Sequence, residues 1–202
     1  MIRIKNLGKS VKGKDIIRNV NLSFNDKGLY LLKGDNGAGK STLLSIIGLI
    51  DNNYTGLLEI DGCNFKSDFL GFRRTAYRRR NISFLMPKNN LIEEETAEAN
   101  LDYFSDKKYS WPFKDIDLTE KAGQLSGGEQ QLIGLVREIK SDRRIMLLDE
   151  ITSFLDDKKT RWILDQLEKI SEDKLVIFAT HDQRVSFPSA RTIFLDKGII
   201  ND

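Results

Sequence analysis

The segment from residue 34 to residue 41, GDNGAGKS, constrains the fold of this 202-residue chain more than any other feature. It follows the apolar run Leu29–Lys33, which is expected as a buried strand. Its glycines let backbone N–H groups turn inward and approach an anion without side chains in the way. A helix expected from Lys40 to about Leu49 would point its positive N-terminal end at the same anion. The spacing therefore predicts a phosphate-binding turn, with a plain connecting turn as the weaker alternative.

Short apolar runs alternate with longer amphipathic stretches, a pattern typical of α/β proteins with mainly parallel strands. The continuous apolar runs Ile145–Leu148 and Leu175–Phe178 are expected as central strands that are covered on both faces. Other elements are also expected: strands at residues 19–24, 57–60 and 81–86, a late hairpin at 192–198, and helices at 126–140 and 157–170. We interpret the more polar residues 87–124 as a small, mostly helical insertion.

Composition excludes several classes of protein. Hydrophobic residues make up 40% of the chain and charged residues 31%, which is an ordinary balance for a globular protein. The formal net charge of +2 gives no global field that would favour nucleic acid. The single cysteine, Cys63, indicates a reducing compartment. The start of the chain has no apolar core of a signal peptide, and the longest apolar stretch, Leu43–Ile50, is too short to span a bilayer. We therefore expect a cytoplasmic protein that meets a membrane only through a partner.

A second glycine-rich helix start lies at residues 125–131, LSGGEQQ. Ser126 could cap this helix, with Glu129 completing a capping box three residues later. The two successive glycines, Gly127 and Gly128, are costly at a helix start unless something must approach the backbone closely. The segment is thus either a well-capped helix or a second anion site.

Two acidic residues and one histidine follow apolar runs. Asp149 and Glu150 end the run that begins at Ile145, which would deliver both carboxylates to the C-terminal edge of a sheet, where ligands bind. His181, the only histidine of the chain, follows the run that ends at Phe178. An isolated Asp-Glu pair is usually a solvated loop, and a lone histidine is more often structural than catalytic. Their order along the chain favours a functional role for both.

These motifs, in this order from Ile2 to about Ile200, resemble the ABC ATPase family, and in particular the stand-alone ATP-binding subunits of bacterial ABC transporters. The resemblance implies a single ABC-type ATP-binding domain over residues 1–202. Its fold class would be α/β: a P-loop NTPase (RecA-like) core with a mainly parallel sheet, an antiparallel β edge region and a small helical subdomain. The core would lie at about 1–86 and 140–202, and the helical subdomain at about 87–139.

The resemblance also implies a role for each matching residue, with ATP and Mg²⁺ as ligands. Glu150 matches the catalytic glutamate that polarises the attacking water, and His181 matches the switch histidine that contacts the γ-phosphate. Ser41 and Asp149 match the residues that bind Mg²⁺. The expected nucleotide contacts are Gly34, Asp35, Asn36, Gly37, Ala38, Gly39, Lys40, Ser41, Thr42, Ser126, Gly127, Gly128, Glu129 and Asp156.

In this family the signature segment of one subunit closes over the ATP held by the other. The expected partners are therefore a second copy of the chain, or a homologous subunit, and a transmembrane permease, with no nucleic acid. The subunit would sit on the inner face of the cell membrane through that permease and drive the export of a peptide, lipid or antimicrobial compound. Two alternatives remain: a soluble ABC ATPase of translation or DNA repair, and an ATP-binding regulator with weak hydrolysis.

Several positions depart from the family pattern. Val11 stands where an aromatic residue commonly stacks on adenine, so weaker adenine binding is expected. Pro87 stands where a glutamine usually touches Mg²⁺ and signals to the permease, and Lys88, Asn89 or Asn90 would have to replace part of that role. Hydrolysis is expected to survive, at a reduced rate. In the segment Ser153–Asp156, which resembles the family's D-loop, Phe154 replaces the usual small residue, and Ile151 replaces a proline just before it.

A basic cluster surrounds Tyr77. It is formed by Arg73, Arg74, Arg78, Arg79 and Arg80. The cluster is either the solvated side of a helix or a contact for the membrane partner or anionic lipid headgroups.

Overall fold

The structure, a computed structural model, describes residues 1–66, 68, 70–87, 91–103 and 111–201. Its main sheet has the strand order β10-β9-β3-β8-β7-β6. These strands are β3 (Gly28–Lys33), β6 (Ile82–Leu85), β7 (Ile145–Asp149), β8 (Leu175–Thr180), β9 (Arg191–Asp196) and β10 (Ile199–Asn201). Every neighbouring pair is parallel except β9 and β10, which form the expected late hairpin.

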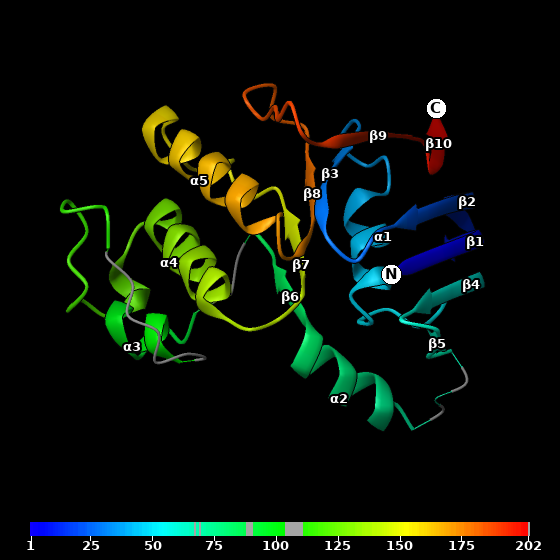
Figure 1. Cartoon of the computed structure of the whole chain (residues 1–202), viewed down its shortest axis with the longest axis horizontal. Helices are drawn as coiled ribbons and strands as arrows, with labels where there is room; N and C mark the ends of the chain where they lie inside the picture. Colours follow the sequence, from blue (N-terminus) through cyan, green and yellow to red (C-terminus); the bar gives the residue numbers. More distant parts are fainter. Residues whose placement is uncertain (67, 69, 88–90, 104–110, 202) are drawn as a thin grey trace.

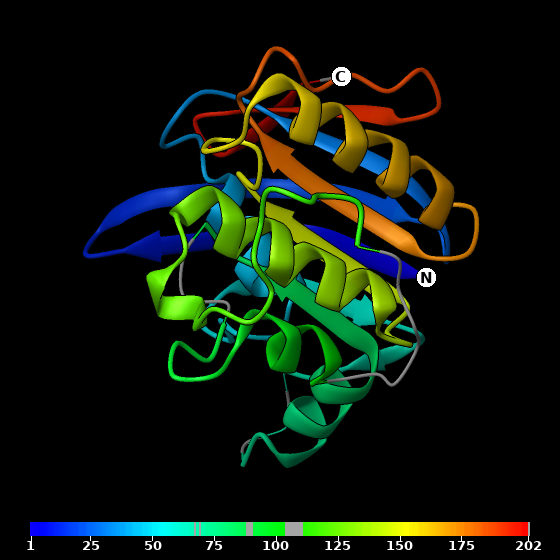
Figure 2. The same ribbon diagram turned by 90° about the vertical axis from the view of Figure 1, so that its left-hand side faces the viewer.

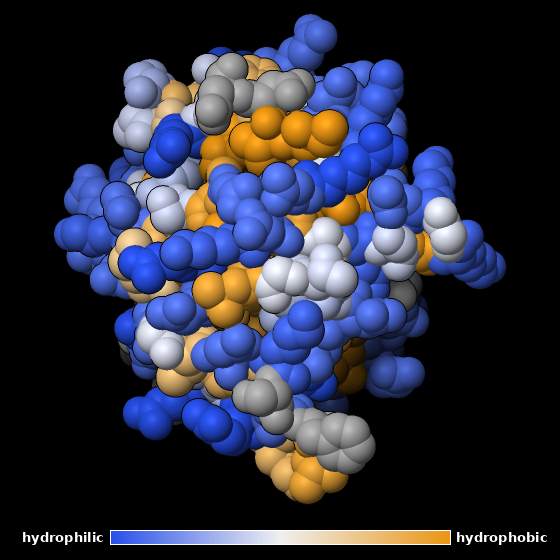
Figure 3. Space-filling view, turned by 90° about the vertical axis from the view of Figure 1, so that its right-hand side faces the viewer, coloured by the Kyte–Doolittle hydropathy of each residue, from blue (hydrophilic) through white to orange (hydrophobic). Residues whose placement is uncertain are grey.

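A second sheet is antiparallel, with the order β2-β1-β4-β5. Its strands are β1 (Ile2–Val11), β2 (Lys14–Phe24), β4 (Thr55–Ile60) and β5 (Cys63–Asn64). It lies beside the main sheet, across α1 (Lys40–Ile47) (Figure 1). The outer face of this part of the molecule is mostly hydrophilic, with hydrophobic residues in separate patches (Figure 3). The α/β fold class with a mainly parallel sheet and an antiparallel edge region is thus confirmed.

Helices cover both faces of the main sheet. On one side lies α1, and on the other side lie α4 (Gly127–Lys140) and α5 (Asp157–Ile170), as Figures 1 and 2 show. Alternate side chains of β7 divide between the two layers: Leu147 packs in the cluster that contains α1, and Leu148 in the cluster that contains α4 and α5. This period-two alternation explains why the strand reads as continuously apolar. Because α1 and α4 cover opposite faces of the main sheet, the two glycine-rich helix starts also lie on opposite faces.

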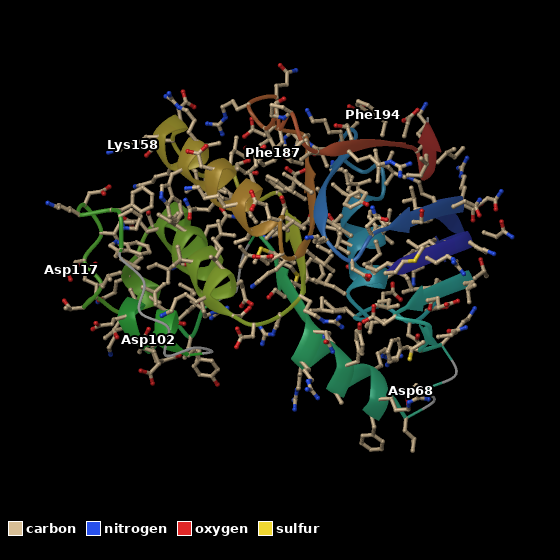
Figure 4. The ribbon with its side chains drawn as sticks, in the orientation of Figure 1. Asp68, Asp102, Asp117, Lys158, Phe187 and Phe194 are labelled. Carbon is tan, nitrogen blue, oxygen red and sulfur yellow. The ribbon has the colours of Figure 1, made fainter. Side chains whose placement is uncertain are left out.

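The segment 87–124 differs from the prediction of a mostly helical insertion. Among its described residues, helix occurs only in α3 (Ala97–Asp102) and in a short 3₁₀ turn at Ala122–Gln124. Asp102, labelled in Figure 4, accepts a hydrogen bond from Lys140 Nζ at 2.5 Å, and this contact joins α3 to α4. Phe113 and Ile116, which also lie in this segment, are buried although they lie outside any helix or strand. The proposed boundaries of a subdomain at about 87–139 stay a prediction.

The basic cluster lies on α2 (Phe72–Asn81), a helix with no buried residue, so its helical interpretation is confirmed. Asp68, also labelled in Figure 4, accepts a hydrogen bond from the Arg74 backbone amide at 2.7 Å near the start of this helix. Tyr77 packs on Phe65 and donates a hydrogen bond to Asp61 at 2.6 Å, which fixes the inner side of α2. A contact of the arginines with a membrane partner or lipid stays a prediction.

None of the helices in the described part of the chain has the length and apolar character needed to cross a membrane.

Candidate functional site

The glycine-rich turn between β3 and α1 has the backbone that its sequence predicts. Gly34, Gly37 and Gly39 have φ angles of 156°, 80° and 105°. A Cβ at Gly34 would lie 2.1 Å from the Leu195 carbonyl oxygen, and a Cβ at Gly39 would lie 2.9 Å from the Ile16 carbonyl oxygen. Only glycine fits these places, because L side chains rarely adopt such φ values and the space is already filled. The turn is therefore held in shape by both neighbouring sheets.

The N-terminus of α1 has no side chain that caps it. Its N-cap is Gly39, which makes no side-chain hydrogen bond, and no acidic residue lies in the first turn. The first amides of a helix have no intrahelical partner, and the helix dipole adds positive potential there. Residues Lys40, Ser41 and Thr42 therefore begin a helix whose end is left open for an anion.

Lys40 lies in the turn itself. Its Nζ atom donates hydrogen bonds to the carbonyl oxygens of Gly34 at 2.8 Å and Asp35 at 3.2 Å, and lies 3.4 Å from Glu150 Oε1. The Lys40 side chain is only 5% exposed, so its ammonium group is largely shielded from bulk water. A phosphate would replace these neutral acceptors with a charged one, and charge-assisted hydrogen bonds are stronger.

Asp149 ends β7 next to this cation and is buried. Burial raises the pKa of its carboxyl, the charge of Glu150 raises it further, and a hydrogen bond with Ser41 lowers it. Within the described residues, Asp149 Oδ1 has no hydrogen-bond partner although it is inaccessible to solvent. A buried, unsatisfied carboxylate oxygen beside a hydroxyl fits a hard cation or its bound water.

The same residues limit what kind of metal could bind. The described part of the chain contains no group of three or more His, Cys, Asp or Glu side chains able to hold a metal by itself. Mg²⁺ commonly uses one or two protein ligands together with substrate phosphates and water. Ser41 and Asp149 therefore fit Mg²⁺ that arrives with a phosphate, and do not fit a metal that is caged by protein alone.

Glu150 and His181 lie together, as the sequence predicts. The Nδ1 atom of His181 is 2.9 Å from Glu150 Oε1, and the His181 amide donates to Glu150 Oε2 at 3.3 Å. Thr180 Oγ1 donates to the same Oε2 atom at 3.3 Å. Glu150 has a φ of 50°, an uncommon value for a non-glycine residue and one that is often found at functional sites. The carboxylate is thus held from several sides, within reach of the Lys40 ammonium.

The second glycine-rich helix start is organised differently. Ser126 and Glu129 form the complete capping box: Glu129 N donates to Ser126 Oγ at 3.4 Å, and Ser126 N donates to Glu129 Oε2 at 2.8 Å. A Cβ at Gly127 would meet nothing within 4 Å, whereas a Cβ at Gly128 would lie 2.6 Å from the Phe154 carbonyl oxygen. Gly127 therefore faces open space, and Gly128 is required for close packing on the segment after Glu150. The capping interpretation is confirmed, and an anion contact here stays a prediction.

Asp156 also acts as a helix cap. Its side chain accepts a hydrogen bond from Lys159 N at 2.8 Å, at the start of α5. Neither Asp156 nor the signature residues 126–129 lie in the group formed by Lys40, Asp149, Glu150 and His181, since α1 and α4 are on opposite faces of the main sheet.

Two of the departures from the family pattern, Val11 and Pro87, have different surroundings. Val11 ends β1 and is 46% exposed, so the side chain at this position is aliphatic and offers no ring on which adenine could stack. Pro87 is half-buried just after β6. The candidates for the missing glutamine's role, residues 88–90, lie outside the described residues.

Sequence reasoning missed two residues that bear on this site. Thr180 binds the Glu150 carboxylate, and Arg184 binds the segment that follows Glu150. Thr180 could have been found from its position at the C-terminal end of a central strand, where site residues gather. Nothing in the local sequence distinguishes Arg184 from the other arginines of the chain.

Comparisons with known proteins agree on the family of this chain. A family model described as "ABC transporter" matches residues 17–153. The uncharacterized ABC transporter ATP-binding protein MJ0796 of Methanocaldococcus jannaschii is 34% identical, with 98% of this chain and 94% of that protein covered. The lipoprotein-releasing system ATP-binding protein LolD of Novosphingobium aromaticivorans is 31% identical, with 92% and 90% covered.

Two further comparisons concern transport direction and structure. The methionine import ATP-binding protein MetN of Lactobacillus acidophilus is 33% identical, with 87% of this chain but only 54% of that protein covered. The solved structure of MJ0796 as a dimer in a post-hydrolysis state with ADP and Pi has a TM-score of 0.86 and 29% identity. It covers 100% of this chain and 97% of that one.

Proposed function

Because the chain belongs to the ABC transporter ATP-binding family, we propose that it binds and hydrolyses ATP as one of two subunits that drive a separate transmembrane permease. The match over residues 17–153 and the identity with MJ0796 along almost the whole chain carry the family membership. ATPase chemistry belongs to that family, and a similar protein was captured with ADP and Pi.

One observation carries the proposed chemistry: the Glu150 carboxylate lies between the Lys40 ammonium, at 3.4 Å, and the His181 imidazole, at 2.9 Å. Hydrolysis needs a group that orients water, a cation that stabilises phosphate charge and a donor near the terminal phosphate. The site brings all three to the open end of α1, where backbone amides can hold the β- and γ-phosphates.

In the proposed reaction, the oxygen of a water molecule forms a bond to the γ-phosphorus while the bond from phosphorus to the ADP oxygen breaks. Glu150 accepts a hydrogen bond from this water and polarises it, and the proton that the water loses ends on an oxygen of the released phosphate. Lys40 exchanges its bonds to the Gly34 and Asp35 carbonyl oxygens for bonds to phosphate oxygens. His181 leaves Glu150 and holds the γ-phosphate. Mg²⁺ bound through Ser41 and Asp149 would neutralise phosphate charge.

The signature residues 126–129 are proposed to act on the nucleotide of the partner subunit. They begin α4 on the face of the main sheet opposite to α1, so they face away from their own phosphate-binding turn. A second copy of the chain could bring its signature over this turn, as two subunits would do in a closed dimer. The dimeric state of the MJ0796 structure supports this arrangement.

The test is a comparison of ATP hydrolysis by the purified wild type and by Glu150→Gln. We expect the substitution to lower the rate by about a hundredfold or more, because a positioned base contributes at least that much. The variant should still bind ATP and form dimers in its presence. A wild-type rate no higher than that of Glu150→Gln would overturn the proposal.

For the transported substrate, we propose the export of a peptide, lipid or antimicrobial compound from the inner face of the cell membrane. The similarity to LolD, named for lipoprotein release, supports this direction. The similarity to MetN, named for import, makes direction the point to test. Affinity purification of Glu150→Gln from native membranes with ATP should recover a polytopic membrane protein. Recovery of ribosomes or DNA-associated proteins would favour a soluble ABC ATPase.

A specific observation favours a second candidate, a regulator that binds ATP with little turnover. Pro87 has no amide side chain to contact Mg²⁺ or the attacking water. ATP binding and dimerisation without hydrolysis, even with the membrane partner present, would support the regulator and exclude the transporter motor.

A further inference from the structure

Arg184 lies three residues after His181, and its guanidinium joins separate segments of the fold. Its Nη2 and Nε atoms lie 2.8 and 3.0 Å from oxygen atoms of the Asp182 carboxylate. The same side chain donates to the carbonyl oxygens of Thr152 and Leu155, each at 3.2 Å. The planar fork of an arginine can serve several acceptors at once, which a lysine cannot do in a fixed geometry.

The two carbonyl groups flank an exposed turn. Ser153 and Phe154 lie between them, and the Phe154 side chain is 58% exposed. The Leu155 amide closes the turn by donating to the Thr152 carbonyl oxygen at 3.2 Å. Arg184 therefore holds both ends of the turn and leaves its tip free.

The same guanidinium also reaches α5. Its Nη1 atom donates to Asp157 Oδ1 at 2.8 Å, in the first turn of that helix. The chain after Arg184 is anchored, because Val185 is fully buried and Phe187, labelled in Figure 4, lies in the core cluster that contains α5. The backbone at Arg184 is thus held in place by the buried side chains that follow it.

A short chain of hydrogen bonds continues from this cluster to the catalytic glutamate. Asp182 accepts from Thr152 Oγ1 at 2.9 Å, and its amide donates to Thr180 Oγ1 at 2.9 Å. Thr180 Oγ1 in turn donates to Glu150 Oε2 at 3.3 Å. The turn is also in contact with the signature helix, where only glycine fits at Gly128.

We propose that Arg184 is a positioning residue for hydrolysis: it ties the exposed turn 152–155 to the His181 segment, so that the turn and Glu150 move as one unit. The inference rests on the proposed ATPase function. A surface that contacts a second subunit through Phe154 would then transmit its position directly to the site of hydrolysis. Neither the family pattern nor the local sequence assigns this role to Arg184.

The experiment compares Arg184→Gln and Arg184→Lys with a matched control, Arg191→Gln. Arg191 is an exposed arginine at the start of β9, outside the network. We expect Arg184→Gln to lower kcat by about tenfold, while KM for ATP stays within about twofold, because ground-state binding of the phosphates is untouched. Arg184→Lys keeps the positive charge but loses the planar guanidinium that serves several acceptors at once. Its kcat should therefore be less than about a third of the wild-type kcat. The control should match the wild type.

Amide hydrogen exchange separates this role from a purely structural one. In Arg184→Gln, exchange should become faster in residues 152–157, while the urea midpoint should fall no further than that of Asp182→Asn, which loses the same partly exposed ion pair. An unchanged kcat in Arg184→Gln, full activity in Arg184→Lys or unchanged exchange in residues 152–157 would overturn the proposal. If Arg184→Gln does not fold, Arg184→Lys carries the same test. If the wild type does not hydrolyse ATP, the proposed function fails, and the exchange experiment still decides whether Arg184 holds the turn.

Discussion

The two glycine-rich helix starts of this protein differ in what satisfies their first amides. The N-terminus of α1 begins at Gly39, which offers no capping side chain. The N-terminus of α4 carries a complete capping box from Ser126 and Glu129. Both have the positive potential of a helix start, but only the second is capped by side chains of its own subunit.

We infer from this difference that the two helix starts would serve two different stages of the proposed reaction. The open end packs closely against the Leu195 and Ile16 carbonyl groups in the single subunit, and we infer that it could receive phosphate before a second subunit arrives. The capped end is stable by itself and offers Gly127 to open space. We infer that α1 determines the affinity of one subunit for nucleotide, and that α4 contributes only when two subunits meet.

A matched pair of substitutions, Gly39→Ala and Gly127→Ala, tests this contrast most strongly. Gly39 has a φ of 105°, and a Cβ there would lie 2.9 Å from the Ile16 carbonyl oxygen. We expect a loss of about 2 kcal/mol in unfolding free energy, from the left-handed backbone and the clash. ADP affinity, measured by calorimetry on the single subunit, should fall by about tenfold or more because the amides move.

Gly127→Ala should leave the unfolding free energy within about 0.5 kcal/mol of the wild type, since its Cβ has room. ADP affinity of the single subunit should be unchanged. ATP hydrolysis should fall, because the new methyl group stands where a second nucleotide must approach the helix start. Equal losses of ADP affinity in the two variants would show that the helix ends do not differ in the proposed way.

A smaller effect is expected from Ser126→Ala, which removes the cap of α4. The variant should lose about 1 kcal/mol of unfolding free energy, the usual cost of deleting a serine cap. Thr96→Ala is the matched control, since Thr96 caps α3 through a hydrogen bond from Ala99 N at 3.1 Å. Urea unfolding should give similar losses for both, whereas dimer-dependent ATP hydrolysis should fall only in Ser126→Ala. A fall in both would indicate general destabilisation.

The open helix end could be predicted from sequence because its residues are contiguous. Residues 34–41 specify the turn by local backbone geometry alone, and the helix at 157–170 is signalled by its own cap at Asp156. The strand β1 was missed because its apolar alternation is interrupted: the register shifts between Ile4 and Leu7, and Asn6 has a φ of 49°. Such a bulge removes the period-two pattern on which strand prediction depends.

The rest of the site depends on contacts that are distant in sequence. Arg184 binds the carbonyl groups of Thr152 and Leu155, and backbone acceptors leave no trace in the residue types. The prediction that the segment 87–124 is mostly helical was wrong for a related reason. Its buried residues Phe113 and Ile116 are placed by the core that receives them and not by a helical period. The sequence thus predicts which groups would carry the chemistry, whereas the structure was needed to find which residues hold them in place.

The smallest expected effect concerns two aspartates with opposite environments. Hydrogen bonds from Arg184 lower the pKa of Asp182 to about 2, from 3.8, whereas burial raises the pKa of Asp149. A lowered pKa in the folded state adds stability above pH 3.8, and this contribution is lost as pH falls toward 2. A raised pKa acts in the opposite sense, so the ionised Asp149 weakens the nucleotide-free fold at neutral pH.

Near neutral pH we therefore expect Asp182→Asn to lower the urea midpoint and Asp149→Asn to raise it. Each change should be within about 1 kcal/mol, since solvent screens the exposed Arg184 and Asn keeps part of the hydrogen bonding. Both differences from the wild type should shrink as the pH is lowered from 5 toward 2, where the wild-type carboxylates become protonated. Changes of the same sign in the two variants would contradict the contrast: Asp149 would then be a satisfied structural group like Asp182, and its buried oxygen would not be awaiting a cation.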